Sequence, residues 1–257
     1  MTTASRFSRR ARNLMVCTAV AVVGILAVAV AAQPGGVVVS YRAPGGVYKG
    51  LRPTAVGLPQ IGEQGTVGVG DFAAVLRRYH DSGAYERDLS TVDGAAQRYL
   101  DRRLTEKHKG KPALVLDIDE TALSNYAGLV KSGFTAAGLA QSVVSGTMVP
   151  IKPTLALYRN ALRHHVAVFF ITGRPSLLDA LTKTDLRGAG YNSGWKALYE
   201  KPLTEGVEAF KSATRAAIQH RGYDIIANVG DQESDLDGGH ADAAFKLPDP
   251  FYFIADR

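Results

Sequence analysis

Hydrophobic and polar residues follow three different patterns along the chain. Residues 14–32 form an uncharged apolar run behind the basic stretch SRFSRRARN. Residues 33–70 are rich in glycine and proline and keep no helical or strand period. From Asp71 onward, apolar residues recur at regular intervals, as they do in a folded domain. These patterns predict a signal or anchor segment at 1–32, an arm or linker at 33–70 and one domain at 71–257.

The domain is predicted to alternate between strands and helices. Continuous apolar runs are typical of strands buried on both faces, and apolar residues every three to four positions are typical of helices. The predicted strands are 113–119, 166–172 and 224–230, and the predicted helices are 154–164, 176–190 and 205–222. This βαβ alternation predicts an α/β fold with a mostly parallel central sheet and helices on both faces.

A helical region is also predicted before the first strand. Its apolar face consists of Tyr85, Leu89, Val92, Ala96, Tyr99 and either Arg103 or Leu104. Gly110 and Pro112 are expected to end the helix, because neither residue continues one. The apolar face should pack on the domain.

The N-terminal run supports two interpretations. Its basic flank and its small residues at the end are typical of a cleaved signal peptide, and its nineteen residues are also enough to span a bilayer uncleaved. Both interpretations predict export, either as a secreted protein or as an extracytoplasmic protein held by an N-terminal anchor. Cys17, the only cysteine, lies inside this run, so the rest of the chain has no disulfide or thiol chemistry.

The net charge of +6 does not indicate a nucleic acid partner. Residues 1–62 hold seven basic residues and no acidic one, which leaves 23 basic and 24 acidic residues in 63–257. The predicted domain is therefore close to neutral, and a surface for polyanions is not expected.

Polar residues follow each of the three predicted strands. They are Asp117 and Asp119, Thr172 and Gly173, and Asp231 with Asp235 close behind. Since ligands of open parallel sheets bind outside the carboxyl ends of the strands, these residues should meet at one site. Clustered carboxylates repel one another unless a cation is present, and oxygen ligands suit a hard divalent ion, with Mg²⁺ the best match. No set of cysteine and histidine suits zinc.

Four sequence motifs resemble, in order, those of the haloacid dehalogenase (HAD) superfamily. They are DIDET, ITGR, Lys211 in FKSATR, and NVGDQESDL. Together with LVLDIDETALSN, FFITGRP and the ending FKLPDPFYFI, they resemble most closely the acid phosphatase branch, subfamily IIIB, which contains bacterial class C enzymes and plant vegetative storage proteins. The resemblance covers about residues 75–257. It implies a Rossmann-like three-layer sandwich with a small helical cap inserted at about 121–152.

The resemblance also implies roles for the motif residues. Asp117 would be the nucleophile that forms an aspartyl-phosphate, and Asp119 the general acid and base. Thr172, Gly173 and Lys211 would bind the phosphoryl oxygens, and Mg²⁺ would be held by Asp117, the backbone carbonyl of Asp119, Asp231 and Asp235. Two alternatives stay open. In one, Asp235 anchors Lys211 instead of holding the ion. In the other, Lys211 is a solvent-facing helix lysine. Arg174 is equally consistent with packing at a helix start, a salt bridge to an acid, or phosphate contact.

The implied activity is that of an exported, Mg²⁺-dependent phosphomonoesterase acting on small phosphate monoesters. The alternatives are a phosphotransferase of the same superfamily and a storage or binding protein without activity. The intact Asp117 argues against the last alternative.

Overall fold

The computed structural model describes residues 69–254. The expected signal or anchor segment (1–32) and most of the expected arm (33–70) lie outside these residues. No helix between 69 and 254 combines the length and the apolar character needed to cross a bilayer. The described residues fall into two compact units, 125–148 and the remaining 69–124 with 149–254.

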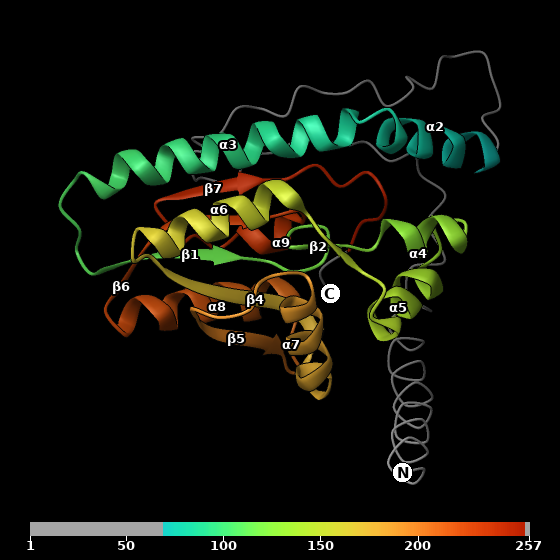
Figure 1. Ribbon diagram of the computed structural model, residues 1–257. Helices are drawn as coiled ribbons and strands as arrows, with labels where there is room; N and C mark the ends of the chain where they lie inside the picture. The colour runs from blue at the N-terminus through green and yellow to red at the C-terminus, as the bar shows by residue number, and fades with distance from the viewer. Residues whose placement is uncertain (1–68, 255–257) are drawn as a thin grey trace, which may run out of the picture. The chain divides into compact units, whose positions relative to one another are not determined.

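A five-stranded parallel sheet forms the centre of the larger unit (Figure 1). Its strands are β1 (Lys111–Leu116), β4 (Ala167–Pro175), β5 (Trp195–Lys201), β6 (Tyr223–Gly230) and β7 (Ala243–Lys246). Their order across the sheet is β5-β4-β1-β6-β7, and every pairing is parallel. The prediction of an α/β fold with a mostly parallel sheet is confirmed.

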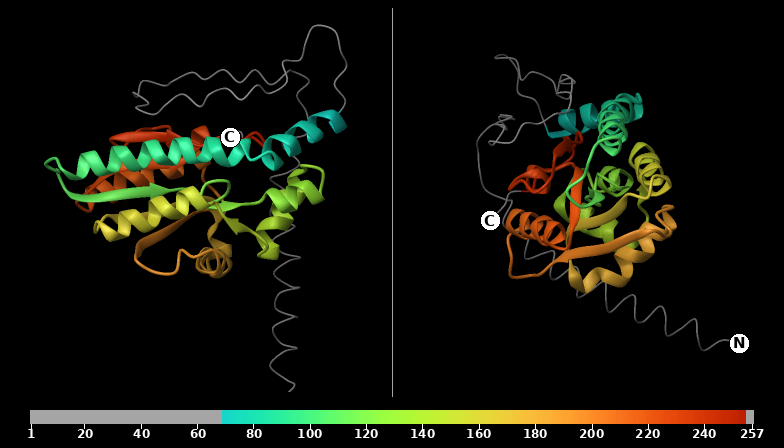
Figure 2. Two further views of the ribbon diagram at one scale, coloured as in Figure 1. Left: turned by 45° about the horizontal axis from the view of Figure 1, so that its top comes forward. Right: turned by 90° about the vertical axis from the view of Figure 1, so that its left-hand side faces the viewer.

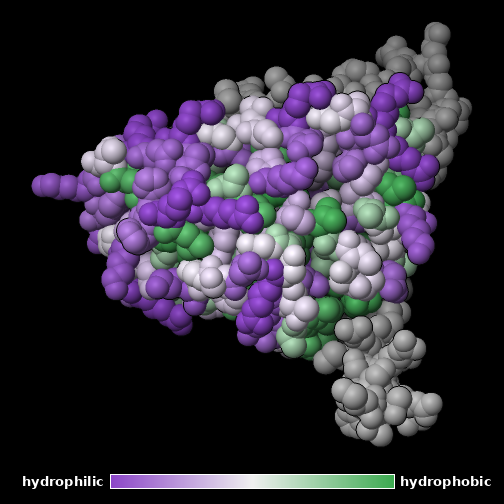
Figure 3. Space-filling model, viewed as in Figure 1, coloured by the Kyte–Doolittle hydropathy of each residue, from purple (hydrophilic) through white to green (hydrophobic). Residues whose placement is uncertain are grey.

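Helices cover both faces of this sheet. The helices of the larger unit are α2 (Val69–Asp81), α3 (Ala84–Leu104), α6 (Lys152–Arg163), α7 (Asp179–Gly188), α8 (Val207–His220) and the short α9 (Glu233–Leu236), with a 3₁₀ turn at Ser176–Leu178 before α7. Helices α3 and α6 lie side by side on one face, and α8 lies on the other (Figure 2). Hydrophilic residues predominate on the outer side of α3 and α6 (Figure 3), because the apolar stripes of these helices face the sheet.

Alternation along the strands fills the two halves of the core. Side chains of consecutive residues point to opposite faces of a strand. Ala113 and Val115 of β1 therefore join a cluster with Phe210 and Ile218 of α8. The opposite face of the sheet contributes Phe170, whose ring lies 6.2 Å from that of Tyr158 on α6.

The region before β1 forms two helices. Gly83, whose φ of +74° favours glycine, separates α2 from α3. The predicted apolar face of α3 is buried from Tyr85 to Tyr99, and Leu100 continues it in place of Arg103 or Leu104. The helix ends at Leu104, well before Gly110.

Two strands of the sheet were not predicted, and one ends earlier than predicted. β5 and β7 are edge strands, which are not buried on both faces and so lack a continuous apolar run. β1 ends at Leu116 and not at 119, because the backbone turns directly after it and the Ile118 carbonyl accepts the N–H groups of Ala122 and Leu123, both at 2.8 Å.

The insert after β1 is small and helical, as predicted. Two short antiparallel strands, β2 (Leu123–Ser124) and β3 (Val149–Pro150), pair at its two ends. Between them, the compact unit 125–148 contains α4 (Tyr126–Lys131) and α5 (Ala136–Ser145). The hydroxyl of Thr135 caps α5 by accepting the N–H of Gly138 at 3.1 Å.

Candidate active site

The register of the three central strands brings their carboxyl ends together. Leu116, the last residue of β1, is level with Phe170 on β4 and with Val229 on β6. The next backbone N–H, that of Asp117, donates to the carbonyl of Val229 at 3.0 Å. The polar residues that follow each strand therefore lie along one edge of the sheet, as the sequence predicts.

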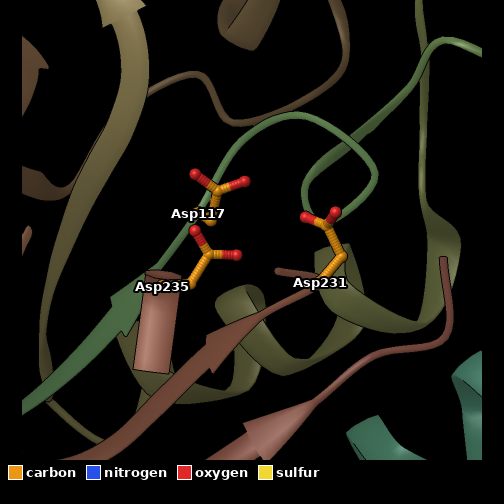
Figure 4. A group of neighbouring side chains, drawn as sticks. All are labelled: Asp117, Asp231 and Asp235. Atoms are coloured by element: carbon orange, nitrogen blue, oxygen red, sulfur yellow. The ribbon is translucent and has the colours of Figure 1, made fainter. Parts of the chain in front are cut away.

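Three aspartates at this edge point toward one another. Asp117 follows β1, Asp231 follows β6 and Asp235 belongs to α9 (Figure 4). Each side chain is buried, and each offers an oxygen within 4.8 Å of the other two. Three of the four predicted metal ligands thus meet through their carboxylates. The fourth, Asp119, was predicted to ligate only through its backbone carbonyl.

Lys211 lies among these carboxylates. It comes from α8, its side chain is buried, and its Nζ donates to Asp117 Oδ1 at 2.5 Å and to Asp235 Oδ1. The interpretation of Lys211 as a solvent-facing helix lysine is therefore wrong. Asp235 does anchor Lys211, and its other oxygen accepts the backbone N–H of Gln232 at 2.8 Å.

Asp119 takes part in a different network. Its two carboxylate oxygens accept hydrogen bonds from Nη2 and Nε of Arg174 at 2.8 and 2.9 Å. Arg174 Nη1 also donates to Asp185 Oδ2 on α7, at 3.1 Å. Of the three roles open to Arg174, the structure therefore shows the salt bridge.

Thr172 and Gly173 lie at the carboxyl end of β4, beside this network. Thr172 is buried, and its hydroxyl accepts the backbone N–H of Arg174 at 3.1 Å. Their predicted role in binding phosphoryl oxygens stays a prediction.

A family model described as HAD superfamily, subfamily IIIB (acid phosphatase), matches residues 69–255. The chain belongs to this family. Vegetative storage protein 1 of Arabidopsis thaliana is 34% identical over 183 residues, which span 67% of this chain and 66% of that protein. Acid phosphatase 1 of Solanum lycopersicum is 30% identical over 192 residues, 72% of this chain and 75% of that protein.

A solved structure supports the same assignment at the level of the fold. The class C acid phosphatase from Bacillus anthracis matches with a TM-score of 0.62 at 20% identity, over 73% of this chain and 87% of that chain. The resemblance read from the four motifs and the HAD-like fold are both confirmed. The family is one of phosphoric monoester hydrolases.

Burial dominates the electrostatics of this phosphatase site. Burial raises the pKa of Asp117 well above its usual value, and the Asp235 carboxylate raises it further, while Lys211 opposes both effects. Burial and Asp235 likewise raise the pKa of Asp231. Burial lowers the pKa of Lys211, but Asp117 and Asp235 more than compensate, so the lysine stays charged. Three buried oxygen donors with an excess of negative charge fit a hard divalent cation.

The sequence did not predict how Asp231 is held. Thr121 Oγ1 donates to Asp231 Oδ1 at 2.9 Å, and Gln232 Nε2 donates to Asp231 Oδ2 at 2.6 Å. The same Gln232 amide donates to Asp249 Oδ2 at 2.9 Å. The C-terminal segment FKLPDPFYFI thus contributes to the site through Asp249.

Glu120 holds the same C-terminal segment from the other side. Its φ of +52° is rare for a residue other than glycine. Its buried carboxylate accepts the hydroxyl of Tyr252 at 2.7 Å. The motif DIDET therefore contains a residue that attaches the C-terminal segment beside the site.

Proposed function

We propose that this protein is an exported phosphomonoesterase that requires Mg²⁺ and hydrolyses small phosphate monoesters through an aspartyl-phosphate on Asp117. The observation that carries the proposal is the buried group of Asp117, Asp231 and Asp235 around the charged Lys211, with Asp119 held beside it. Export rests on the basic and apolar N-terminal sequence alone.

The donor set favours Mg²⁺. Mg²⁺ binds through few protein carboxylates and shares its coordination sphere with substrate phosphate oxygens, and this site offers three carboxylates and no nitrogen or sulfur ligand from the described residues. The carboxylates of Asp117, Asp231 and Asp235 would hold the ion, together with the backbone carbonyl of Asp119. When bound, the ion would offset the negative charge of the transferring phosphoryl group.

The side chains of the site divide the reaction between them. An Asp117 oxygen attacks phosphorus, since carboxylates are competent nucleophiles toward phosphoryl groups. Lys211 orients that carboxylate and supplies a fixed positive charge from a buried position. Thr172 through its hydroxyl and Gly173 through its backbone N–H would bind phosphoryl oxygens. Asp119 would protonate the leaving alcohol and then accept a proton from the attacking water.

Two alternatives predict different products. A phosphotransferase would pass the phosphoryl group to an added alcohol in preference to water. A storage protein, as the name of the relative from Arabidopsis thaliana suggests, would release no phosphate at all.

Phosphate release with and without Mg²⁺ tests the proposal. The purified full-length protein is expected to hydrolyse aryl and sugar phosphates with Mg²⁺ and to lose this activity with EDTA. Asp117→Asn, which lacks the attacking carboxylate, should reduce turnover to background and form no phosphoenzyme. Asp119→Asn should slow both steps by about 10²–10⁴-fold and accumulate a phosphate adduct from an aryl phosphate, visible by intact mass after acid quench.

A matched control removes an aspartate at the amino ends of the strands, away from the site. Asp242 directly precedes β7 and pairs with Arg103 on the surface, so Asp242→Asn should behave as the wild type. An adduct on Asp117→Asn, or full turnover in EDTA, would contradict the proposed mechanism.

A further inference from the structure

We infer that Asp185 and Arg174 are positioning residues for Asp119, so that a carboxylate on α7, outside the four motifs, governs how efficiently the leaving group is protonated. The inference rests on the proposed function, because it takes Asp119 as the group that exchanges protons with the substrate.

The geometry links the three side chains in a row. Arg174 donates from Nε and Nη2 to the two oxygens of Asp119, at 2.9 and 2.8 Å, and from Nη1 to Asp185 at 3.1 Å. A planar guanidinium that makes two parallel bonds to a carboxylate fixes both the position and the plane of that carboxylate. The plane of Asp119 is thereby tied, through Arg174, to helix α7.

Burial makes this arrangement stiff. The side chain of Arg174 is 3% exposed and that of Asp185 is 5% exposed. Asp119, in contrast, is 20% exposed, so the end of the row that would meet the substrate is the accessible one. Burial lowers the pKa of Arg174, but Asp119 and Asp185 raise it by more, so the guanidinium keeps its charge.

The contacts of Arg174 indicate positioning and not phosphate binding as its main role. Three of the five guanidinium N–H groups donate to the two carboxylates. A carboxylate has about four lone-pair directions, of which Arg174 occupies two on Asp119. The two bonds from Arg174 therefore do not by themselves prevent Asp119 from holding or accepting a proton.

The proton transfers at Asp119 balance over one turnover. In the first step an Asp117 oxygen bonds to phosphorus, the bond from phosphorus to the ester oxygen breaks, and that oxygen takes the proton of Asp119. In the second step a water oxygen bonds to phosphorus, the bond to Asp117 breaks, and Asp119 takes a proton from the water. Inorganic phosphate leaves, and both aspartates return to their starting states.

Leaving-group dependence separates positioning of Asp119 from phosphate binding. An alkyl phosphate needs its leaving oxygen protonated, whereas 4-nitrophenyl phosphate has a leaving group that needs little protonation. Loss of phosphate binding lowers kcat/KM for both esters alike. Loss of proton transfer lowers it mainly for the alkyl ester. Since kcat/KM reports events up to formation of the phosphoenzyme, the later hydrolysis step does not enter the comparison.

The experiment measures kcat/KM for 4-nitrophenyl phosphate and glycerol 2-phosphate with the full-length protein at saturating Mg²⁺. Asp185→Ala should raise the ratio of aryl to alkyl kcat/KM by about 10-fold, and Arg174→Lys by about 10²-fold, because a misplaced catalytic group transfers protons poorly. Lysine cannot reproduce the planar fork. Asp185→Asn keeps an acceptor for Nη1 and should restore most of the wild-type ratio.

A control and the contrary outcomes complete the test. Asp179 lies at the start of the same helix and pairs with Lys183 on the surface, so Asp179→Asn should leave the ratio unchanged. The ratio does not depend on the folded fraction, so a destabilised variant remains informative. An unchanged ratio in both Asp185→Ala and Arg174→Lys, with active wild type, would overturn this inference alone. A wild type that hydrolyses neither ester would overturn the proposed function and this inference with it.

Discussion

Asp93 is a buried carboxyl whose titration should contribute measurably to how the stability of this phosphatase varies with pH. It lies on α3, is 3% exposed, and accepts the Thr154 hydroxyl of α6 at 2.9 Å through Oδ2. Its other oxygen, Oδ1, is buried and has no hydrogen-bond partner among the described residues. Burial raises the pKa of Asp93 from 3.8 to about 7, although the bond from Thr154 lowers it.

The direction in which stability changes with pH depends on whether the folded or the unfolded chain holds the proton. Below pH 3.8 the carboxyl is protonated in both the folded and the unfolded chain, and its stabilising contribution is fully present. Between pH 3.8 and about 7 the folded state keeps the proton and the unfolded state releases it, so stability falls as the pH rises. Each pH unit in this range corresponds to about 1.4 kcal/mol of stability. The loss of stability is therefore about 4 kcal/mol over the whole range and about 3 kcal/mol between pH 5 and pH 7.

Asp93→Asn removes this dependence, because an amide of nearly the same shape does not ionise. Its free energy of unfolding, relative to wild type, should therefore increase by about 3 kcal/mol from pH 5 to pH 8. Urea denaturation at fixed Mg²⁺ concentration measures both proteins at each pH, and the other buried carboxyls cancel in the difference. Asp101→Asn, on the exposed side of the same helix, should reproduce the wild-type pH dependence. A difference that stays constant with pH would refute the reasoning.

Three further changes probe the site and its supports. Lys211→Met leaves Asp117 and Asp235 buried without the lysine cation. It should lower the rate of phosphate release by at least about 10²-fold and, in EDTA, lower the free energy of unfolding by about 3–5 kcal/mol. A near-wild-type rate would contradict the role of the lysine. Adding Mg²⁺ to chelated protein should stabilise it by about 2.7 kcal/mol at 100 times the Kd, measured by thermal denaturation; an unchanged midpoint would argue against a metal site. Tyr252→Phe should lower the free energy of unfolding by about 1–3 kcal/mol in denaturation experiments, because the buried Glu120 carboxylate loses the bond from the Tyr252 hydroxyl, and kcat should change little.

The central strands and the helices beside them could be predicted because burial leaves a clear pattern. β1, β4 and β6 have neighbours on both sides in the sheet and helices on both faces, so nearly every side chain is apolar. β5 carries Lys196, Glu200 and Lys201, since an edge strand keeps contact with water. No local pattern distinguishes such a strand from a loop.

The site could be predicted only as far as it depends on the ends of strands. A parallel sheet brings Asp117 and Asp231 together whatever the surrounding side chains are. The pairing of Arg174 with Asp185 depends instead on the rotation of α7 relative to β4, which is set by packing and leaves no motif. The burial of Lys211 was equally hidden, because a lysine on an amphipathic helix is usually exposed.

The charges of the two groups of side chains at the site indicate where a metal ion is expected. Asp117, Asp231 and Asp235 against Lys211 leave two negative charges when all four are ionised, which one divalent cation would balance. Without it, an incoming phosphate would meet a buried negative site and be repelled. In the neighbouring group, Arg174 carries one positive charge and pairs with the carboxylates of Asp119 and Asp185. We therefore expect a divalent cation among Asp117, Asp231 and Asp235, where the larger uncompensated charge lies, whereas Asp119 already has the cation of Arg174 as a partner.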